Sequence, residues 1–346
     1  MFRVGLTVDF LRPDGRQAFP DIDLGPLDRA EGVEWHCLET GADEVPPEAA
    51  ADCDALLVLG PRISAATLAD AGRLAVVARI GVGYDSVDVD ACTRAGAALT
   101  ITPDGVRRPV ASAAMAFLLA LAHRLPSKDR LTREGRWAER VDHMGLGLRG
   151  RTLGVVGLGN IGREVCRLCA PFEMTLLAAD PVTGEETAAG LGARLVALPE
   201  LLAEADFVLV CCALTEETRH LIGPAELGRM KPTAHLINVA RGPIVDQAAL
   251  TEALREGAIA GAAIDVFEEE PVDPADPILR LDNVIVAPHA LAWTDESFRL
   301  MGESAFAGIL AVSEGRAPGH VVNGEVLETE SFRAKLAACA RRRRGA

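Results

Sequence analysis

The sequence of 346 residues lacks several features that identify particular classes of protein. It has no excess of basic residues, and its formal net charge of −15 argues against a nucleic-acid backbone or an anionic membrane surface as partner. It has no apolar run long enough to span a bilayer, because "VASAAMAFLLALAH" at 110–123 is too short and suits a buried helix. We expect no secretory signal, since "MFRVGLTVDF" opens directly into a strand-like segment.

The cysteines also lack a recognisable framework. Eight are scattered along the chain, and Cys166 and Cys169, although spaced C-x-x-C, lie in a helical pattern with no second pair to complete a zinc site. We therefore expect free buried thiols, no metal and a reducing, cytoplasmic location. The run "RRRR" at 341–344 is a short basic segment, where we expect a frayed, solvated tail.

Short apolar runs rich in β-forming residues alternate with helical patterns along almost the whole chain. There is no internal repeat and no low-complexity segment, and the length favours two domains. Continuous apolar strands that alternate with helices predict parallel sheets covered on both faces. The predicted strands are "VGLTV", "ALLVLG", "AVVARIGVG" and "AALTIT" in the first hundred residues, then "RTLGVVGLG", "MTLLAAD", "DFVLVCCA", "AHLINVA", "AIAGAAIDVF" and "NVIVAPH".

The pattern places a join between two α/β units near residue 103. Pro103, Gly105 and Pro109 interrupt the strand rhythm before a long apolar helix that we expect from about 109 to 125. This helix has little polar face, so it is either central or packed against another subunit, and we expect a homodimer. The predicted parts are one domain of residues 1–102 and 294–330, a second of residues 103–293, and a basic tail of residues 331–346.

A glycine-rich turn opens the second unit. Gly157, Gly159 and Gly162 have G-x-G-x-x-G spacing, follow an apolar strand and open a helix, which is the context that binds a pyrophosphate. The next predicted strand ends in Asp180, whose carboxylate can accept both hydroxyl hydrogens of an adenosine ribose and would repel a 2′-phosphate. The pattern therefore predicts NAD, in preference to NADP, as the cofactor.

Three polar groups follow later strands of the same unit. A nicotinamide enzyme acting on a hydroxyl or carbonyl needs a proton donor and acceptor, and His289 comes directly after a strand in "NVIVAPHA". Arg241, after the strand in "LINVARGPIV", could hold a substrate carboxylate bidentately, although read alone it could equally be a surface ion-pair residue. In "GAAIDVFEEEPV", residues 261–272, one of three consecutive glutamates could turn back to tune a partner.

Together these segments resemble the D-isomer-specific 2-hydroxyacid dehydrogenase family. The resemblance runs from "ARIGVGYDSVDVDAC" through "GLGNIG" and "INVARGPIVDQAAL" to "DVFEEEP" and "APHA". It implies that Arg241, Glu270 and His289 are the catalytic set, with Glu268 and Glu269 forming a solvated strand end. The implied reaction is reversible reduction of a small 2-keto acid, in which His289 gives its proton to the carbonyl oxygen and Glu270 stabilises the imidazolium.

The resemblance also implies a fold and a set of binding residues. The fold is a flavodoxin-like substrate domain and a Rossmann NAD-binding domain with a cleft between them. The backbone N–H groups of Val82 and Gly83 would meet the substrate carboxylate, and Asp265 would meet the nicotinamide carboxamide. The implied cofactor-binding residues are Gly157, Gly159, Asn160, Ile161, Gly162, Asp180, Leu214, Thr215, Thr218, Ala240 and Asp265.

Some positions depart from the family pattern. Ile101 and Ser112 stand where the family often has Asn and Glu, and Ala213 replaces a Pro. "PHALAWTDE" lacks the Gly pair of phosphoglycerate dehydrogenase relatives, so the chain looks closer to glyoxylate and hydroxypyruvate reductases. From its length we expect no appended regulatory domain. Arg62, in "LGPRIS", is either a second contact for an anionic substrate or a surface residue.

Two other functions are compatible with the same residues. The first is an NAD-sensing interaction protein, because proteins that resemble this family include transcriptional co-repressors. The second is oxidation of phosphite or formate on the same scaffold. The predicted partners are a small 2-keto or 2-hydroxy acid and a second copy of the chain, with no nucleic acid and no membrane.

Overall fold

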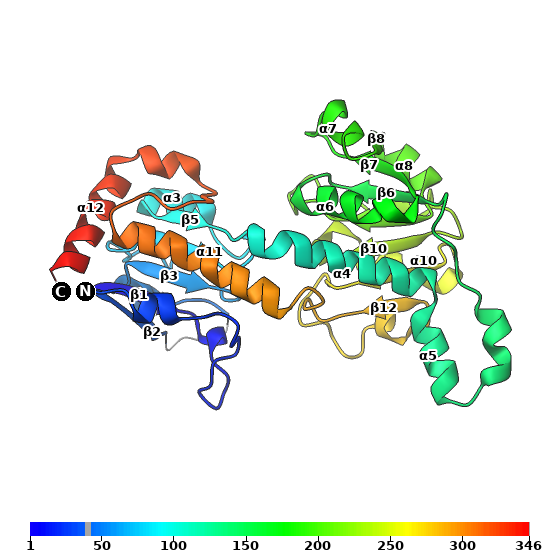
Figure 1. Ribbon diagram of the computed structural model, residues 1–346, viewed down its shortest axis with the longest axis horizontal. Helices are drawn as coiled ribbons and strands as arrows, with labels where there is room; N and C mark the ends of the chain where they lie inside the picture. Colours follow the sequence, from blue (N-terminus) through cyan, green and yellow to red (C-terminus); the bar gives the residue numbers. More distant parts are fainter. Residues whose placement is uncertain (39–42, 346) are drawn as a thin grey trace. The chain divides into compact units, whose positions relative to one another are not determined.

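The computed structural model of the protein describes residues 1–38 and 43–345. The chain divides into two compact units (Figure 1), of which unit 1 contains residues 1–106 and 293–346 and unit 2 contains residues 107–292. Each unit is built around its own parallel sheet. Residue 346, the last of the predicted tail, and residues 39–42 of the predicted first domain lie outside the described residues.

Unit 1 contains a five-stranded sheet in which all neighbouring strands are parallel. Its order, β2-β1-β3-β4-β5, is flavodoxin-like and confirms the predicted fold. All four residues of "ALLV" in β3 are buried because alternate side chains enter two different hydrophobic clusters, one on each face of the sheet. The strands are β1 (Phe2–Leu6), β2 (Val33–Cys37), β3 (Ala55–Val58), β4 (Val76–Arg79) and β5 (Ala98–Thr100).

The helices of unit 1 come from both ends of the chain. Helix α11 is capped by Thr294, whose Oγ1 accepts the N–H of Ser297 (3.1 Å). Phe298 and Ile309 of this helix pack in the same cluster as Val4 of β1, so a late segment completes the core around the first strand. The helices are α1 (Gly25–Asp28), α2 (Pro47–Ala51), α3 (Val89–Ala95), α11 (Asp295–Ser313) and α12 (Glu330–Arg344), with 3₁₀ helices η1 (Val8–Phe10) and η6 (Gly324–Glu328).

The basic segment that was expected to be a frayed, solvated tail is helix α12, so that expectation is wrong. Thr329 caps the helix by accepting the N–H of Phe332 (3.2 Å), and the arginine run falls in the last turn, where the helix dipole favours positive charge. Phe332, Leu336 and Cys339 are spaced four and three residues apart and pack against the clusters of unit 1. The segment is therefore an amphipathic part of the fold.

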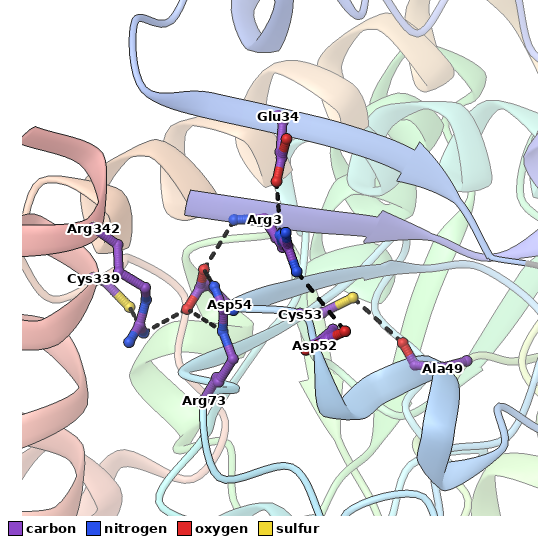
Figure 2. Close-up of polar contacts among 9 residues, drawn as sticks. All are labelled: Arg3, Glu34, Ala49, Asp52, Cys53, Asp54, Arg73, Cys339 and Arg342. Carbon is purple, nitrogen blue, oxygen red and sulfur yellow. Dashed lines mark hydrogen bonds and ion pairs between the residues drawn. The ribbon is translucent and has the colours of Figure 1, made fainter. Parts of the chain in front are cut away.

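Charge also anchors α12 (Figure 2). The carboxylate of Asp54 is fully buried and lies 2.5 Å from Nη2 of Arg342 and 2.7 Å from Nη2 of Arg73, and it accepts the backbone N–H of Arg3 (2.9 Å). Lys335 donates three hydrogen bonds to backbone carbonyls (2.6 to 3.2 Å), and burial lowers the pKa of its ammonium group to about 8. A buried charge is tolerated only when it is paired in this way, so the contacts of Asp54 and Lys335 hold α12 against the rest of unit 1.

Unit 2 contains a seven-stranded parallel sheet with the order β12-β11-β10-β9-β6-β7-β8. Read from β8, this is the Rossmann order 3-2-1-4-5-6 with β12 added beside β11, and it confirms the predicted fold. The order reverses between β6 and β9, and in such sheets ligands bind outside the carboxyl ends of the strands at this point. The strands are β6 (Thr152–Val156), β7 (Thr175–Ala179), β8 (Ala193–Leu195), β9 (Phe207–Val210), β10 (His235–Asn238), β11 (Gly261–Ile264) and β12 (Val284–Val286).

Helix α5 and the 3₁₀ helix η2 precede β6, and the helices that follow them in unit 2 fall between its strands in chain order. These helices are α5 (Leu125–Arg133), α6 (Asn160–Cys169), α7 (Glu185–Ala189), α8 (Leu198–Glu204), α9 (Pro224–Leu227) and α10 (Gln247–Glu256), with 3₁₀ helices η2 (Trp137–His143), η3 (Ala170–Phe172), η4 (Gly242–Ile244) and η5 (Pro277–Arg280).

Helix α4 (Asp104–Ala122) begins five residues before the predicted start at Pro109 and ends earlier than predicted. Pro109 has no N–H with which to bond the carbonyl of Gly105 four residues earlier. The hydroxyl of the buried Ser297 takes that role, donating to the Gly105 carbonyl at 2.8 Å. A Cβ on Gly105 would lie 2.6 Å from the backbone nitrogen of Met301, so α4 begins in direct contact with α11.

The expectation that no apolar run is long enough to span a bilayer is wrong for α4, which by length and composition is the one helix among the described residues that could cross a membrane. Its apolar side chains are nevertheless part of the core of unit 2: Ala111, Ala114 and Leu118 are buried in a cluster with Leu153 of β6 and Phe207 of β9. These contacts account for the apolar character of α4, which is a buried helix as the sequence indicated.

Candidate active site

The glycine-rich turn joins β6 to α6, as predicted. Gly157 has a φ of +95°, and a Cβ there would lie 2.6 Å from a backbone atom that follows β9. A Cβ on Gly162 would lie 2.3 Å from the carbonyl oxygen of Gly157, so the helix packs directly on the turn. The space beside Gly159 is open, and Asn160 and Ile161 begin α6 with free N–H groups typical of a helix start. The turn therefore fits a pyrophosphate.

Asp180 follows β7 and faces this turn. Its carboxylate accepts the backbone N–H groups of Leu158 (2.7 Å), Val182 (2.9 Å) and Thr183 (2.7 Å). Partial burial opposes ionisation, but these donors outweigh it and hold the pKa of Asp180 below its ordinary value. A negative charge therefore lies at the end of β7, the second strand of unit 2, where it would repel a 2′-phosphate.

The segment after β9 carries three more of the predicted cofactor residues. Oγ1 of Thr218 accepts the N–H of Thr215 (2.7 Å) and donates to the carbonyl of Ala213 (2.7 Å). Leu214 is half-buried between them. The two threonine hydroxyls therefore fix the shape of this turn by themselves, and any contact that they make with an adenosine would be additional.

Arg241 lies in a turn after β10 that Asn238 organises. The buried Asn238 donates from Nδ2 to the carbonyl of Arg241 (3.0 Å) and accepts the N–H of Ala240 at Oδ1 (3.0 Å). The guanidinium donates from Nη1 to the carbonyl of Ala240 (2.8 Å). A Cβ on Gly242 would lie 1.8 Å from the carbonyl oxygen of Phe267, so the turn packs against the segment after β11.

That segment holds Glu270, which pairs with His289. Nδ1 of His289 lies 2.7 Å from Oε2 of Glu270, and Oε1 accepts the N–H of Phe267 (2.9 Å). Partial burial would raise the pKa of Glu270, but the His289 contact, the Phe267 donor and the charge of Arg241 hold it below its ordinary value. The carboxylate is therefore ionised at neutral pH, and Nε2 is the ring nitrogen of His289 that remains to exchange a proton with a ligand.

Asp265 supports the turn on which His289 lies. It is buried, and its carboxylate accepts the N–H groups of Ala290 (3.1 Å) and Leu291 (3.1 Å), while its carbonyl accepts the N–H of His289 (2.7 Å). Burial raises the pKa of Asp265 against the opposing effect of these donors. Asp265 therefore holds the backbone of His289, which has a φ of +54°. This role does not depend on any contact between Asp265 and a nicotinamide.

The structure brings Arg241, Glu270 and His289 to one place, because β10, β11 and β12 are neighbours and their carboxyl ends share one edge of the sheet of unit 2. Val82 and Gly83 lie in unit 1, half-exposed in the turn after β4. The predicted catalytic and cofactor-binding residues are therefore all in unit 2, including Arg241, which is also a predicted contact for the substrate carboxylate, whereas the other two predicted carboxylate contacts are in unit 1.

The expectation for the other two glutamates is correct for one and wrong for the other. Glu269 is exposed, as predicted. Glu268 is not a solvated strand end, because its Oε1 contacts Nε2 of His220 and its Oε2 accepts the N–H of Gln247 (3.2 Å). Nothing in the local pattern links residues 220 and 268, which are 48 positions apart, so sequence reasoning missed this pair.

The thiols give no sign of metal or nucleophilic chemistry. The cysteines all lie among the described residues, and each is free. Burial raises the pKa of Cys166 to about 11 and that of Cys169 to about 12, so these thiols stay protonated and unreactive. Within residues 1–38 and 43–345 no group of three His, Cys, Asp or Glu side chains is placed to hold a metal ion.

Known proteins resemble the chain over most of its length. It is 43% identical over 301 residues to a glyoxylate reductase of Korarchaeum cryptofilum (strain OPF8), which covers 84% of this chain and 91% of that protein. A D-3-phosphoglycerate dehydrogenase of Archaeoglobus fulgidus is 40% identical over 78% of this chain, but the match spans only 51% of that protein. The crystal structure of D-lactate dehydrogenase from Aquifex aeolicus, complexed with NAD and lactic acid, has a TM-score of 0.82 at 27% identity and covers 93% of this chain and 99% of its own.

The domain-level match agrees with the site. The family model described as D-isomer specific 2-hydroxyacid dehydrogenase, NAD binding domain, matches residues 115–290, which is nearly all of unit 2. The glycine turn and Asp180 lie within the matched residues, as do Arg241, Glu270 and His289. The chain therefore belongs to the D-isomer-specific 2-hydroxyacid dehydrogenase family, and its cofactor is NAD.

Proposed function

We propose that the protein reduces a small 2-keto acid, such as glyoxylate or hydroxypyruvate, to the D-2-hydroxy acid with NADH. The observation that carries the proposal is the 2.7 Å contact between Nδ1 of His289 and Glu270, at the same sheet edge as Arg241 in an NAD-binding unit. The choice of substrate is supported by the glyoxylate reductases among the relatives, which align over most of both chains.

Each protein group has a defined role in this reaction. Arg241 pairs with the substrate carboxylate and polarises the neighbouring carbonyl, and the N–H groups of Val82 and Gly83 donate to the same carboxylate. NADH, when bound, supplies the hydride that adds to the carbonyl carbon. His289 starts as the imidazolium and gives its Nε2 proton to the carbonyl oxygen, which leaves the alcohol and a neutral imidazole. Glu270 stays ionised and stabilises the imidazolium until that transfer.

The cofactor residues follow the same logic. The N–H groups at the start of α6, at Asn160 and Ile161, receive the pyrophosphate, and the ionised Asp180 receives the ribose hydroxyls. The remaining contacts that we propose are with Leu214, Thr215, Thr218, Ala240 and Asp265. Because Asp180 would repel a 2′-phosphate, the Asp180→Asn variant should raise the kcat/KM ratio of NADPH to NADH by about tenfold or more. An unchanged ratio would show that Asp180 does not select the cofactor.

We further propose that the protein is a cytoplasmic homodimer. Four apolar side chains in the segment from the start of α5 to the residue after η2 are 59% to 75% exposed: Leu125, Trp137, Val141 and Met144. Exposed apolar side chains gathered in this way are typical of an interaction surface, and a second copy is the partner proposed. Light scattering should give a dimer for the wild type and a monomer for Trp137→Glu, whereas a monomeric wild type would contradict the proposal. Free cysteines support the cytoplasmic location.

The first experiment is NADH oxidation with a panel of 2-keto acids, run with the wild type and His289→Ala. NADPH is the cofactor control, and NAD reduction by phosphite and by formate tests the other chemistry. Turnover of a 2-keto acid that the variant loses supports the proposal. Tight NADH binding with no turnover of any panel member contradicts it.

A further inference from the structure

Glu268 and His220 form a second carboxylate–imidazole pair in unit 2, and the proposed reaction does not use it. The side chain of His220 is 43% exposed and that of Glu268 is 30% exposed. Oε1 of Glu268 contacts Nε2 of His220, and Oε2 accepts the N–H of Gln247 (3.2 Å). The backbone N–H of Glu268 donates to Oε1 of Gln247 (3.0 Å). Both carboxylate oxygens and the N–H of this residue are therefore engaged.

The partners of this carboxylate come from different parts of unit 2. His220 follows the turn that Thr215 and Thr218 fix, on the side proposed for the adenosine. Gln247 begins α10 and comes three positions after η4, the 3₁₀ helix that follows Arg241. The carboxylate itself lies two residues before Glu270. One side chain thus connects a cofactor-side turn to the segments of both catalytic residues.

Backbone contacts reinforce the connection. The N–H of His220 donates to the carbonyl of Pro243 (2.8 Å), and Gly242 packs on the carbonyl of Phe267. His220 has a φ of +50°, in the left-handed region that residues with a Cβ rarely adopt and that neighbouring contacts must maintain. The backbone bond to Pro243 and the ring contact with Glu268 together maintain this conformation of His220.

We propose that Glu268 and His220 are positioning residues that couple cofactor binding to the placement of Arg241 and Glu270. The proposal rests on the proposed function, since it needs the turn of Thr215 and Thr218 to contact the cofactor. Contact of NADH with that turn is transmitted through the imidazole to Glu268, and from there to the segments that carry the catalytic side chains. Neither residue touches the reacting atoms.

The test compares Glu268→Ala, His220→Asn and the double variant, with Glu269→Ala as the matched control on the exposed neighbour. Asn is chosen at 220 because it tolerates the left-handed conformation. Each single variant should lower kcat about tenfold and raise the NADH Kd several-fold without changing the KM for the keto acid. The double variant should be no worse than either single variant, because the two residues act as one unit.

A conservative variant separates positioning from a loss of packing. In Glu268→Gln the amide oxygen can accept the N–H of Gln247 and the amide N–H can donate to an unprotonated imidazole, so this variant should recover most of the kcat lost in Glu268→Ala. Melting temperatures are recorded for every variant. If Glu268→Ala does not fold, the comparison of His220→Asn with Glu268→Gln and Glu269→Ala decides the question.

Two results would overturn the proposal: equal kcat and NADH Kd for Glu268→Ala and Glu269→Ala, or a double variant whose losses multiply. The NADH Kd is measured without substrate, so it reports on the coupling even when no keto acid is turned over. If the wild type turns over no keto acid but the variants still show the coupled changes in NADH Kd, the proposed function is refuted and the positioning role is kept.

Discussion

Unit 2 contains two glutamate–histidine pairs, and they differ in the ring nitrogen that the carboxylate binds. Glu270 contacts Nδ1 of His289, the nitrogen nearer to the main chain, so Nε2 at the tip of the ring remains for a ligand. Glu268 contacts Nε2 of His220, so the tip is occupied. We therefore propose that the same two side chains act as a proton donor in one place and as a positioning contact, or brace, in the other, and that the orientation of the ring decides between these roles.

The backbone does not separate the two histidines. His289 has a φ of +54° and His220 a φ of +50°, and each lies in a turn held by backbone hydrogen bonds to another segment. Both rings are also similarly exposed, at 42% and 43%. Conformation and exposure alone would class them together, so the hydrogen-bond partner of each nitrogen is the feature that distinguishes them.

The largest expected effect is that of His289→Asn. Loss of a general acid and base costs 10²- to 10⁴-fold, so kcat should fall by about 10³-fold, against about tenfold for His220→Asn. Steady-state kinetics with the best 2-keto acid measures both. Equal losses for the two variants would abolish the distinction between donor and brace.

Glu270→Gln should be next, with kcat lower by about 10²-fold because an amide can orient His289 but cannot stabilise its positive charge. Glu268→Gln should lose only about twofold, since its contacts require hydrogen bonding more than charge. The two variants differ in position alone, so they form a matched pair. A loss for Glu268→Gln as large as that for Glu270→Gln would mean that both carboxylates act on the charge of the site.

The acid stability of the protein should also distinguish the catalytic pair. The pKa of Glu270 is lowered from an ordinary value of 4.5, so its contribution to folding is complete above that pH and is lost as the pH falls through the lowered value. The melting temperature of the wild type should exceed that of Glu270→Gln at about pH 6, and the difference should shrink toward pH 3. A difference independent of pH would contradict the ionised state of Glu270. Differential scanning fluorimetry measures it.

Arg62→Ala should have the smallest effect and sets the baseline for the comparison. The side chain is exposed, and the described contacts of this residue are backbone hydrogen bonds that join it to Asp43 and Val45. The relative kcat/KM values for small and phosphorylated substrates should change by less than about twofold. A larger change would make Arg62 a substrate contact after all.

Local patterns were sufficient to predict the fold class and to nominate the candidate catalytic and cofactor residues. Gly157 and Gly162 are both required by the close packing of one turn. Arg241 and His289 each come three positions after the end of an apolar strand, so the signal lies in neighbouring residues. The two parallel sheets follow from apolar strands that alternate with helices, and both are confirmed. The roles assigned to the site residues remain predictions.

The features that were missed depend on contacts between distant segments or on a pattern that charge obscured. The partner of Glu268 lies on another loop, and the role of Ser297 at α4 depends on a carbonyl that Pro109 leaves free. Helix α12 was different, since the cap at Thr329 and the spacing of its apolar residues were available in the sequence. The run of four arginines instead indicated a solvated tail. Arginine side chains can, however, pack their aliphatic stems against the core while their charged groups form ion pairs.

The buried carboxylate of Asp54 also bears on the order in which the two units fold during synthesis. Unit 2 is one continuous stretch, and all of its residues exist once the ribosome has passed residue 292. Unit 1 has its first strands by then, but Asp54 still lacks the guanidinium that α12 supplies at Arg342. Domains fold as units while the chain emerges, so the part of the protein that is translated first is the part that matures last.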